Sequence, residues 1–286
     1  MATILVAVDH SEQSLKAVRF ALSYAGEADE LTLLHVIPRY PAKNSLNPLG
    51  IKSIQDHLLE DAHAELAEIK ALAEASGVTY RLDIQFGDIP SVISQYAKDG
   101  YEALIMGTHG YGRVIGALMQ SVSYPTLHDV QIPVFLISGE TDATRFPWRK
   151  VLIAVDGSEH ARKAVLCAIE ASRGMDAEFT LMTVVPSPYL YAGTFGAGWE
   201  DEATLEEWGY STLRPYEEIM QSHGLPYTRK VIIGDPAIEI RKTAEAEADL
   251  LVLGHHGQGA VAGMVMGSVT FKLIHRAKLP LLVVKK

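Results

Sequence analysis

VLIAVDGSEHA, residues 151–161, decides the fold, because the chain contains this stretch twice. ILVAVDHSEQS, residues 4–14, has the same order of apolar residues, aspartate and serine. Three more pairs of segments match: LTLLHVIP and FTLMTVVP, GTHGYG and GHHGQG, and QIPVFLI and KLPLLVV. Asp9 and Asp156, Gly107 and Gly254, and Pro133 and Pro280 are all separated by the same number of residues. This constant spacing indicates two copies of one domain in tandem. We predict domains at 1–139 and 150–286, joined by a polar linker at 140–149.

Each copy alternates short apolar, β-branched runs with segments of helical period. In the second copy the expected strands are VLIAV, FTLMTVV, YTRKVII, LLVLG and PLLVV. Ser11 and Ser158 are expected to cap the first helix of each copy, and Asp235 is expected to cap a helix with Pro236 at its first position. Strands that are apolar almost throughout are typical of a parallel sheet covered on both faces. The predicted fold is therefore α/β, with two tandem doubly wound domains, each a five-stranded parallel sheet of order 3-2-1-4-5 with helices on both faces.

Composition sets further bounds. The 286 residues are 48% hydrophobic and carry a net charge of −10, without an apolar run long enough for a membrane span and without a readable signal peptide. The charge argues against binding of nucleic acid through phosphate contacts. The single cysteine, Cys167, excludes an internal disulfide and agrees with a reducing compartment. We expect a cytoplasmic protein that contacts neither membrane nor nucleic acid.

The stretch GHHGQGAVAGMVMGSVT, residues 254–270, is expected to follow the fourth strand of the second copy. Glycine lets backbone N–H groups approach an anion closely, so phosphate is the ligand that this composition favours, and a turn that needs glycine only for its geometry is the alternative. No Walker lysine motif exists, and the glycines follow the fourth strand instead of the first, which argues against a P-loop and against NAD. In a sheet of this order the loop after the first strand faces the same crevice.

The pattern G-x-x-G, nine residues, then G-S, together with the V-A-V-D openings, resembles the universal stress protein family over essentially the whole chain. The resemblance implies a Rossmann-like domain of the adenine nucleotide alpha-hydrolase type that holds ATP, ADP or AMP. It also implies that Asp156 contacts the adenosine, that the backbone at Val184 meets the adenine edge and that Gly254 lies near the ribose. The phosphates would be held by His256, Gly257, Gly267, Ser268, Val269 and Thr270. Mg²⁺ or Mn²⁺ could bridge phosphate oxygens, but no dedicated carboxylate pair is present.

The first copy departs from this pattern, because Gln120 replaces the third glycine. We expect weaker or absent triphosphate binding there, with an adenosine-sized ligand still allowed. The residues of this degenerate second site would be Asp9, Val36, Gly107, His109, Gly110, Ser121 and Ser123.

Other residues have simpler interpretations. His255 and His256 are adjacent on a loop without a nearby carboxylate set, so no metal site is predicted. His35, His57 and His63 are expected to be structural or solvent-facing, and residues 54–75 to form one amphipathic helix. The loops after the second strand differ most between the copies. In the second copy, the aromatic- and glycine-rich loop at 187–199 is interpreted as a lid or a partner surface.

The leading hypothesis is a stress-response regulator that binds ATP or AMP in its C-terminal domain. The chain lacks a Walker lysine, a clear general base and an arginine finger, which favours a regulator over a fast enzyme and leaves slow ATP hydrolysis open. The alternative is an interaction scaffold for a protein partner, in which nucleotide is incidental. The apolar last strands, VFLI and LLVV, suggest that the two domains pair within the chain and that the chain forms a homodimer.

Overall fold

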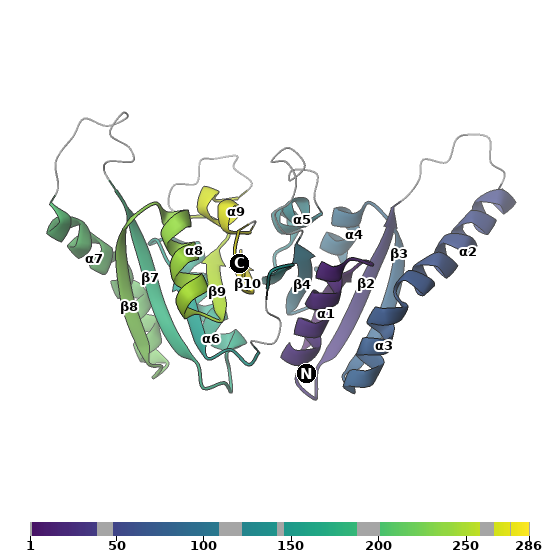
Figure 1. The fold of residues 1–286 in the computed structure, drawn as a ribbon, viewed down its shortest axis with the longest axis horizontal. Helices are drawn as coiled ribbons and strands as arrows, with labels where there is room; N and C mark the ends of the chain where they lie inside the picture. The colour runs from purple at the N-terminus through teal and green to yellow at the C-terminus, as the bar shows by residue number, and fades with distance from the viewer. Residues whose placement is uncertain are drawn as a thin grey trace, which may run out of the picture. The chain divides into compact units, whose positions relative to one another are not determined.

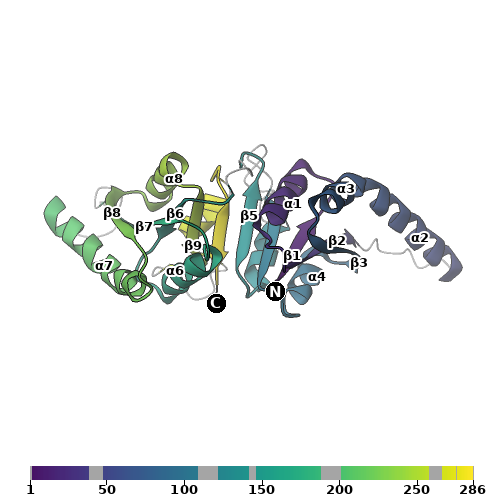
Figure 2. The ribbon, with the colours of Figure 1, turned by 90° about the horizontal axis from the view of Figure 1, so that it is seen from below.

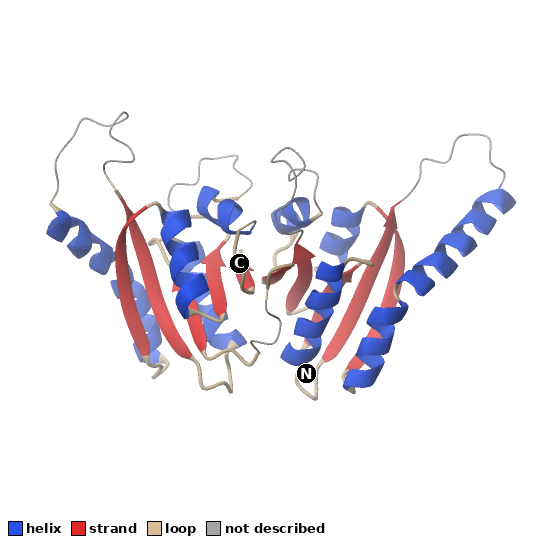
Figure 3. Ribbon diagram, viewed as in Figure 1, coloured by secondary structure: helices blue, strands red, loops and turns tan. Residues whose placement is uncertain are grey.

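The structure is a computed structural model that describes residues 2–38, 48–108, 122–141, 146–187, 201–257, 266–274 and 276–285. The chain divides into two compact units, Met1–Gly139 and Glu140–Lys286. Each unit has its own parallel sheet with helices beside it (Figure 1, Figure 3). None of the helices in these ranges is long and apolar enough to cross a membrane.

The N-terminal unit is a five-stranded sheet of order β3-β2-β1-β4-β5, and every pairing between these strands is parallel. Helices α1 and α3 lie on one face and α4 on the other, with α5 packed against α4 (Figure 2). The strands are β1 (Thr3–Val8), β2 (Glu30–Pro38), β3 (Thr79–Gly87), β4 (Ala103–Thr108) and β5 (Val134–Ser138). The helices are α1 (Glu12–Tyr24), α2 (Pro48–Glu65), α3 (Ala67–Ser76), α4 (Ile89–Tyr96) and α5 (Ser123–Asp129).

The C-terminal unit repeats this arrangement, with strand order β10-β9-β6-β7-β8 and parallel pairing throughout. Helices α6 and α7 cover one face, and α8, with α9 packed against it, covers the other (Figure 2). The strands are β6 (Lys150–Ala154), β7 (Glu178–Pro186), β8 (Tyr227–Gly234), β9 (Leu250–Gly254) and β10 (Leu281–Val284). The helices are α6 (Glu159–Ala171), α7 (Glu202–Ser222), α8 (Pro236–Glu247) and α9 (Ser268–Ile274). The predicted α/β fold and strand order are confirmed in both units.

Local signals explain where the helices begin. The Ser11 side chain accepts a hydrogen bond from the Ser14 N–H, and Ser158 does the same for the Ala161 N–H, so both predicted serine caps are confirmed. Asp235 caps α8, and its side chain accepts from the Ile238 N–H. These caps satisfy backbone donors that the first helical turn leaves without partners.

The expectation of one helix over 54–75 is wrong, because the chain breaks at Leu66 between α2 and α3. Leu66 has φ −90° and ψ 6°, which is outside helical geometry, and its side chain is fully buried. Together with Ile69 and Ala73 it gives α3 an apolar face that packs on α1. Most described side chains of α2 are exposed, and this helix leads away from the strands (Figure 1). The amphipathic period of the segment therefore holds only for α3.

Candidate functional site

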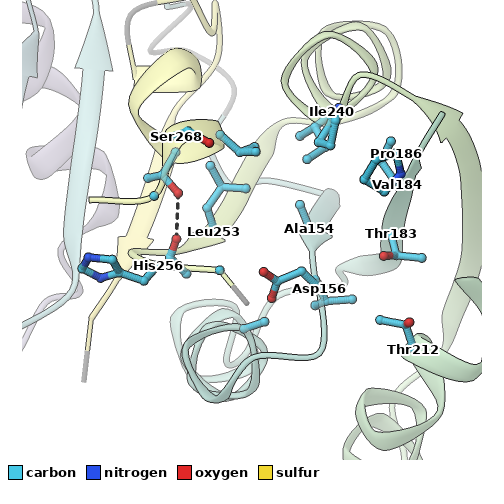
Figure 4. Close-up of a pocket in the computed structure, with 18 of the residues that line it drawn as sticks. Ala154, Asp156, Thr183, Val184, Pro186, Thr212, Ile240, Leu253, His256 and Ser268 are labelled. Atoms are coloured by element: carbon cyan, nitrogen blue, oxygen red, sulfur yellow. Dashed lines mark hydrogen bonds between the residues drawn. The ribbon is translucent and has the colours of Figure 1, made fainter. Parts of the chain in front are cut away.

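A cavity of about 420 Å³ opens at the carboxyl ends of β6, β7 and β9 in the C-terminal unit (Figure 4). Its walls come from the loop after β6, the end of β7, the turn after β9, the start of α9 and single faces of α7 and α8. All nine residues that the sequence pointed to in this unit line the cavity: Asp156, Val184, Gly254, His256, Gly257, Gly267, Ser268, Val269 and Thr270. Residues from distant parts of the chain thus share one space, as expected where strand order reverses.

Asp156 follows β6 and presents its carboxylate to the cavity (Figure 4). The Ser158 N–H donates to Asp156 Oδ1 at 3.1 Å, which fixes the carboxylate beside the start of α6. Gly157, between them, has φ 87°, a conformation that favours glycine. A Cβ at Gly257 would overlap Asp156 Oδ2, so any other residue here would displace the carboxylate from its present position.

The two ends of the glycine-rich stretch are bonded to each other and to β9. The Gly267 N–H donates to the His255 carbonyl at 3.0 Å, and the Thr270 hydroxyl donates to the Gly254 carbonyl at 2.9 Å (Figure 4). A Cβ at Gly254 would lie 2.9 Å from the backbone carbon of His160, so this glycine lets β9 and α6 approach closely. Gly254 thus supports the packing as well as lining the cavity. Residues 258–265 lie outside the described residues.

Three histidines lie together at this turn. His255 is buried, and its Nδ1 is 2.8 Å from Nδ1 of His256, while the rings of His160 and His256 have centroids 5.4 Å apart. In Figure 4 the His256 ring points away from the labelled side chains around the cavity, so this residue faces the space mainly with its backbone. Burial lowers the pKa of His160, and the charges of His256 and Lys163 lower it further. Among the described residues, no group of three His, Cys, Asp or Glu is arranged to hold a metal ion.

Helix α7 forms a wall that sequence reasoning missed. Trp208 and Thr212 line the cavity from this helix, and Thr183 at the end of β7 faces Thr212 (Figure 4). The Tyr216 hydroxyl donates to the Ser158 carbonyl at 3.2 Å, which ties α7 to the loop that carries Asp156. Burial, followed by the charge of Asp156, raises the pKa of Tyr216 to about 12, so this phenol stays a donor. The only available signal was the helical spacing of Trp208 and Thr212, which does not reveal the surface they face.

The equivalent cavity of the N-terminal unit measures only about 100 Å³. Of the residues predicted for a second site, it is lined by Asp9, Val36, Gly107 and Ser123. His109, Gly110 and Ser121, and also Gln120, lie outside the described residues.

Described side chains account for part of this small volume. His35 stands where the C-terminal unit has Thr183, and its ring, which lines the cavity, lies with Nδ1 2.9 Å from the Val8 carbonyl oxygen. The Asp9 N–H donates to the Ser14 hydroxyl at 2.9 Å, and the Ser11 hydroxyl donates to the Asp9 carboxylate. The imidazole of His35 is bulkier than the threonine at the equivalent position, so it takes up part of the space in this cavity. The expectation that His35 is structural agrees with this bond, but its position at the cavity was missed.

The chemistry of the larger cavity suits binding. Asp156 is the one acidic residue among those described as lining it, and these residues include no Lys or Arg. Residues 258–265, QGAVAGMV, contain none either. Negative charge on a ligand must therefore be met by backbone N–H groups, by hydroxyls or by an ion that the ligand brings with it.

Comparison with known proteins gives a consistent result. The sequence model of the universal stress protein family matches residues 1–138 and 147–285. A universal stress protein of Mycolicibacterium smegmatis is 29% identical over 295 residues, which span 99% of this chain and 96% of that protein. The crystal structure of a universal stress protein from Archaeoglobus fulgidus has a TM-score of 0.71 at 23% identity and covers 99% of this chain and 98% of its own. A universal stress protein solved in complex with cAMP covers 48% of this chain and 97% of its own, at 25% identity and a TM-score of 0.36.

Proposed function

The chain belongs to the universal stress protein family as a tandem of two such domains, and we propose that its C-terminal unit binds an adenine nucleotide, ATP, ADP or AMP, beside Asp156. The observation that carries this proposal is the convergence of nine residues, chosen from the sequence, on one cavity of about 420 Å³. Small-molecule sites typically measure roughly 300–1,000 Å³, so the N-terminal cavity of about 100 Å³ is too small for a whole nucleotide.

The orientation follows from charge. Asp156 repels phosphate, so it pairs with donors on the ribose or on the adenine amino group, while the phosphates lie near Gly257, Gly267 and Ser268. Bare glycine backbone offers N–H donors to phosphate oxygens without a side chain in the way. A divalent ion would be held mainly by the phosphates, because the described wall offers only one carboxylate.

The same wall argues for regulation by binding. No described side chain is placed as a cation for the transferring phosphoryl group, and Asp156 is the single acid among the described residues that line the cavity. We therefore expect any ATP hydrolysis to be slower than about 1 s⁻¹, the low end of ordinary enzyme rates. The nucleotide state would then serve as the signal.

The nucleotide content of the purified protein tests the proposal. We expect about one nucleotide per chain in the wild type, because only one of the two cavities reaches the size of a small-molecule site. Gly267→Gln, which introduces the residue that the N-terminal unit has at this position, should remove it. Gly267→Ala is the matched control, because a Cβ there lies at an ordinary 3.4 Å from three backbone atoms. A wild type that carries no nucleotide and binds none when ATP is added would overturn the proposal in favour of a scaffold.

A further inference from the structure

Helix α7 carries a large aromatic side chain at the edge of the cavity. Trp208 lines the cavity, yet 58% of its surface is exposed. The face of α7 that packs on the sheet is formed by other residues, Leu205, Gly209, Leu213, Tyr216 and Met220, all of them buried. The indole of Trp208 is therefore not part of the core.

Two contacts hold α7 close to the sheet and so fix the position of Trp208. A Cβ at Gly209 would overlap Val231 of β8 and lie 3.1 Å from Val185 of β7, so the helix backbone approaches these strands as only glycine permits. Tyr216 bonds to the Ser158 carbonyl two turns further along. The indole is thus presented at the cavity by a well-anchored stretch of helix.

The two sides of the cavity differ in chemistry. Near Ser268 the wall contains the backbone of Gly257 and Gly267 and the hydroxyls of Ser268 and Thr270, beside the apolar Leu253 and Val269. Toward β7 and α7 it contains Val184, Pro186 and Trp208, the one aromatic ring among the described lining residues apart from the imidazole of His256, with the hydroxyls of Thr183 and Thr212. Asp156 lies between these two sides (Figure 4). A nucleotide has the same polarity, with charged phosphates at one end and a flat apolar base at the other, so its base belongs on the α7 side.

We infer that Trp208 is the surface on which the base of the nucleotide stacks, and that it determines specificity by favouring purines. The inference rests on the proposed function. Stacking of a base on an aromatic ring would cover the exposed indole face and needs no change in the fold. A purine offers the larger ring system, so it gains more from the contact than a pyrimidine.

The N-terminal unit supports this assignment by contrast. Its helices α2 and α3 contain no Phe, Trp or Tyr, and none of their described residues lines the smaller cavity. The unit with the larger cavity is therefore also the one whose described helices bring an aromatic ring to it.

Binding of AMP and UMP to nucleotide-free protein, measured by titration calorimetry, tests the inference. Trp208→Ala should weaken AMP binding roughly 10-fold, whereas Trp208→Phe should stay within about threefold of the wild type, since a phenyl ring still stacks. Trp208→Ala should weaken the binding of UMP less than the binding of AMP, so the ratio of the two affinities decreases. Tyr210→Ala is the matched control, because Tyr210 lies on the same helix but contacts Arg229 instead of the cavity.

The outcomes separate this inference from the proposed function. If the wild type binds AMP and Trp208→Ala binds it equally well, Trp208 has no such role, but the site stands. If the wild type binds neither AMP nor ATP, both proposals fail. Unchanged thermal unfolding of Trp208→Ala, expected for so exposed a side chain, shows that a loss of affinity does not come from a loss of fold.

Discussion

The two cavities differ far more than the two sheets that carry them. Both sheets have the same strand order and parallel pairing, but one cavity measures about 420 Å³ and the other about 100 Å³. What is repeated is the framework: the serine caps Ser11 and Ser158, and the close approach of Gly107 and Gly254 to the first helix. What differs is the set of side chains that face the cavity. The shared fold therefore provides a cavity in each unit, and a few side chains decide whether that cavity is large enough for a ligand.

The sharpest single difference between the cavities lies at the end of the second strand of each unit. His35 on β2 pairs in register with Val8, and its ring bonds to the Val8 carbonyl. Thr183 on β7 occupies the corresponding place with a much smaller side chain, and it lines the same cavity as Asp156. Exchange of these two residues therefore tests whether side chains at this position close the cavity.

The largest effect is expected for Thr183→His. The imidazole would take up space beside Asp156 where we place the adenosine, and we expect nucleotide affinity to fall roughly 100-fold, or about 2.8 kcal/mol, near the upper end of overpacking costs. Calorimetric titration with AMP measures this directly. The variant should fold, because the chain itself accommodates histidine at the equivalent place in the N-terminal unit.

The reciprocal variant His35→Thr is the control for this exchange. It should leave nucleotide binding in the C-terminal unit unchanged, since it alters only the other cavity. Wild-type affinity in Thr183→His would show that the ligand does not use this side of the cavity, and would also count against the stacking position of Trp208.

A smaller effect, a loss of stability that is equal in the two units, is expected at the two glycines that both units share. Gly107→Ala and Gly254→Ala each place a Cβ within about 3 Å of backbone atoms in the first helical turn of the unit, at Gln13 or His160. Because backbone cannot move aside as a side chain can, we expect each to lower the free energy of unfolding by about 2 kcal/mol. Chemical denaturation measures the loss. A large loss in one unit alone would show that the two frameworks are not equivalent.

Much of the fold could be predicted because the same pattern of strands and helices occurs twice in the sequence. Strands that are apolar almost throughout, separated by helical segments, leave few arrangements for a parallel sheet, and the helix caps are local signals. The strand order also predicted that Asp156 and the glycine-rich stretch lie close together, since both follow strands at the point where the order reverses. These predictions concern the path of the backbone, which sequence repeats and hydrophobic periods indicate well.

The rest depended on which way side chains face, and patterns along the chain do not encode that. In the sequence, Trp208 is one of several aromatic residues in α7, and nothing in the pattern distinguishes it. Its position at the cavity follows from the close packing of Gly209 on the sheet. Weaker triphosphate binding in the N-terminal unit was predicted from Gln120, which lies outside the described residues; the described wall of the small cavity includes His35, at the end of a strand, and this contribution was not foreseen. The break at Leu66 likewise follows from tertiary packing, which overrides helical period.

The smallest expected effect is on the pH dependence of stability, because the first helix of the C-terminal unit has His160 where that of the N-terminal unit has Gln13. Burial lowers the pKa of His160 below its ordinary value of 6.5, and the neighbouring His256 and Lys163 add to this against the opposing charges of Asp156 and Glu159. The folded state thus prefers the neutral ring, so its stability is full above about pH 6.5 and falls as the unfolded chain takes up the proton first on acidification. His160→Gln, which copies Gln13 of the N-terminal unit, should remove this loss. We therefore expect the unfolding free energy of the wild type, relative to His160→Gln, to be constant near pH 8 and to decrease below pH 6.5 in denaturation series of nucleotide-free protein. A relative stability that rises on acidification would mean that the acidic neighbours outweigh burial, and that His160 gains a proton on folding.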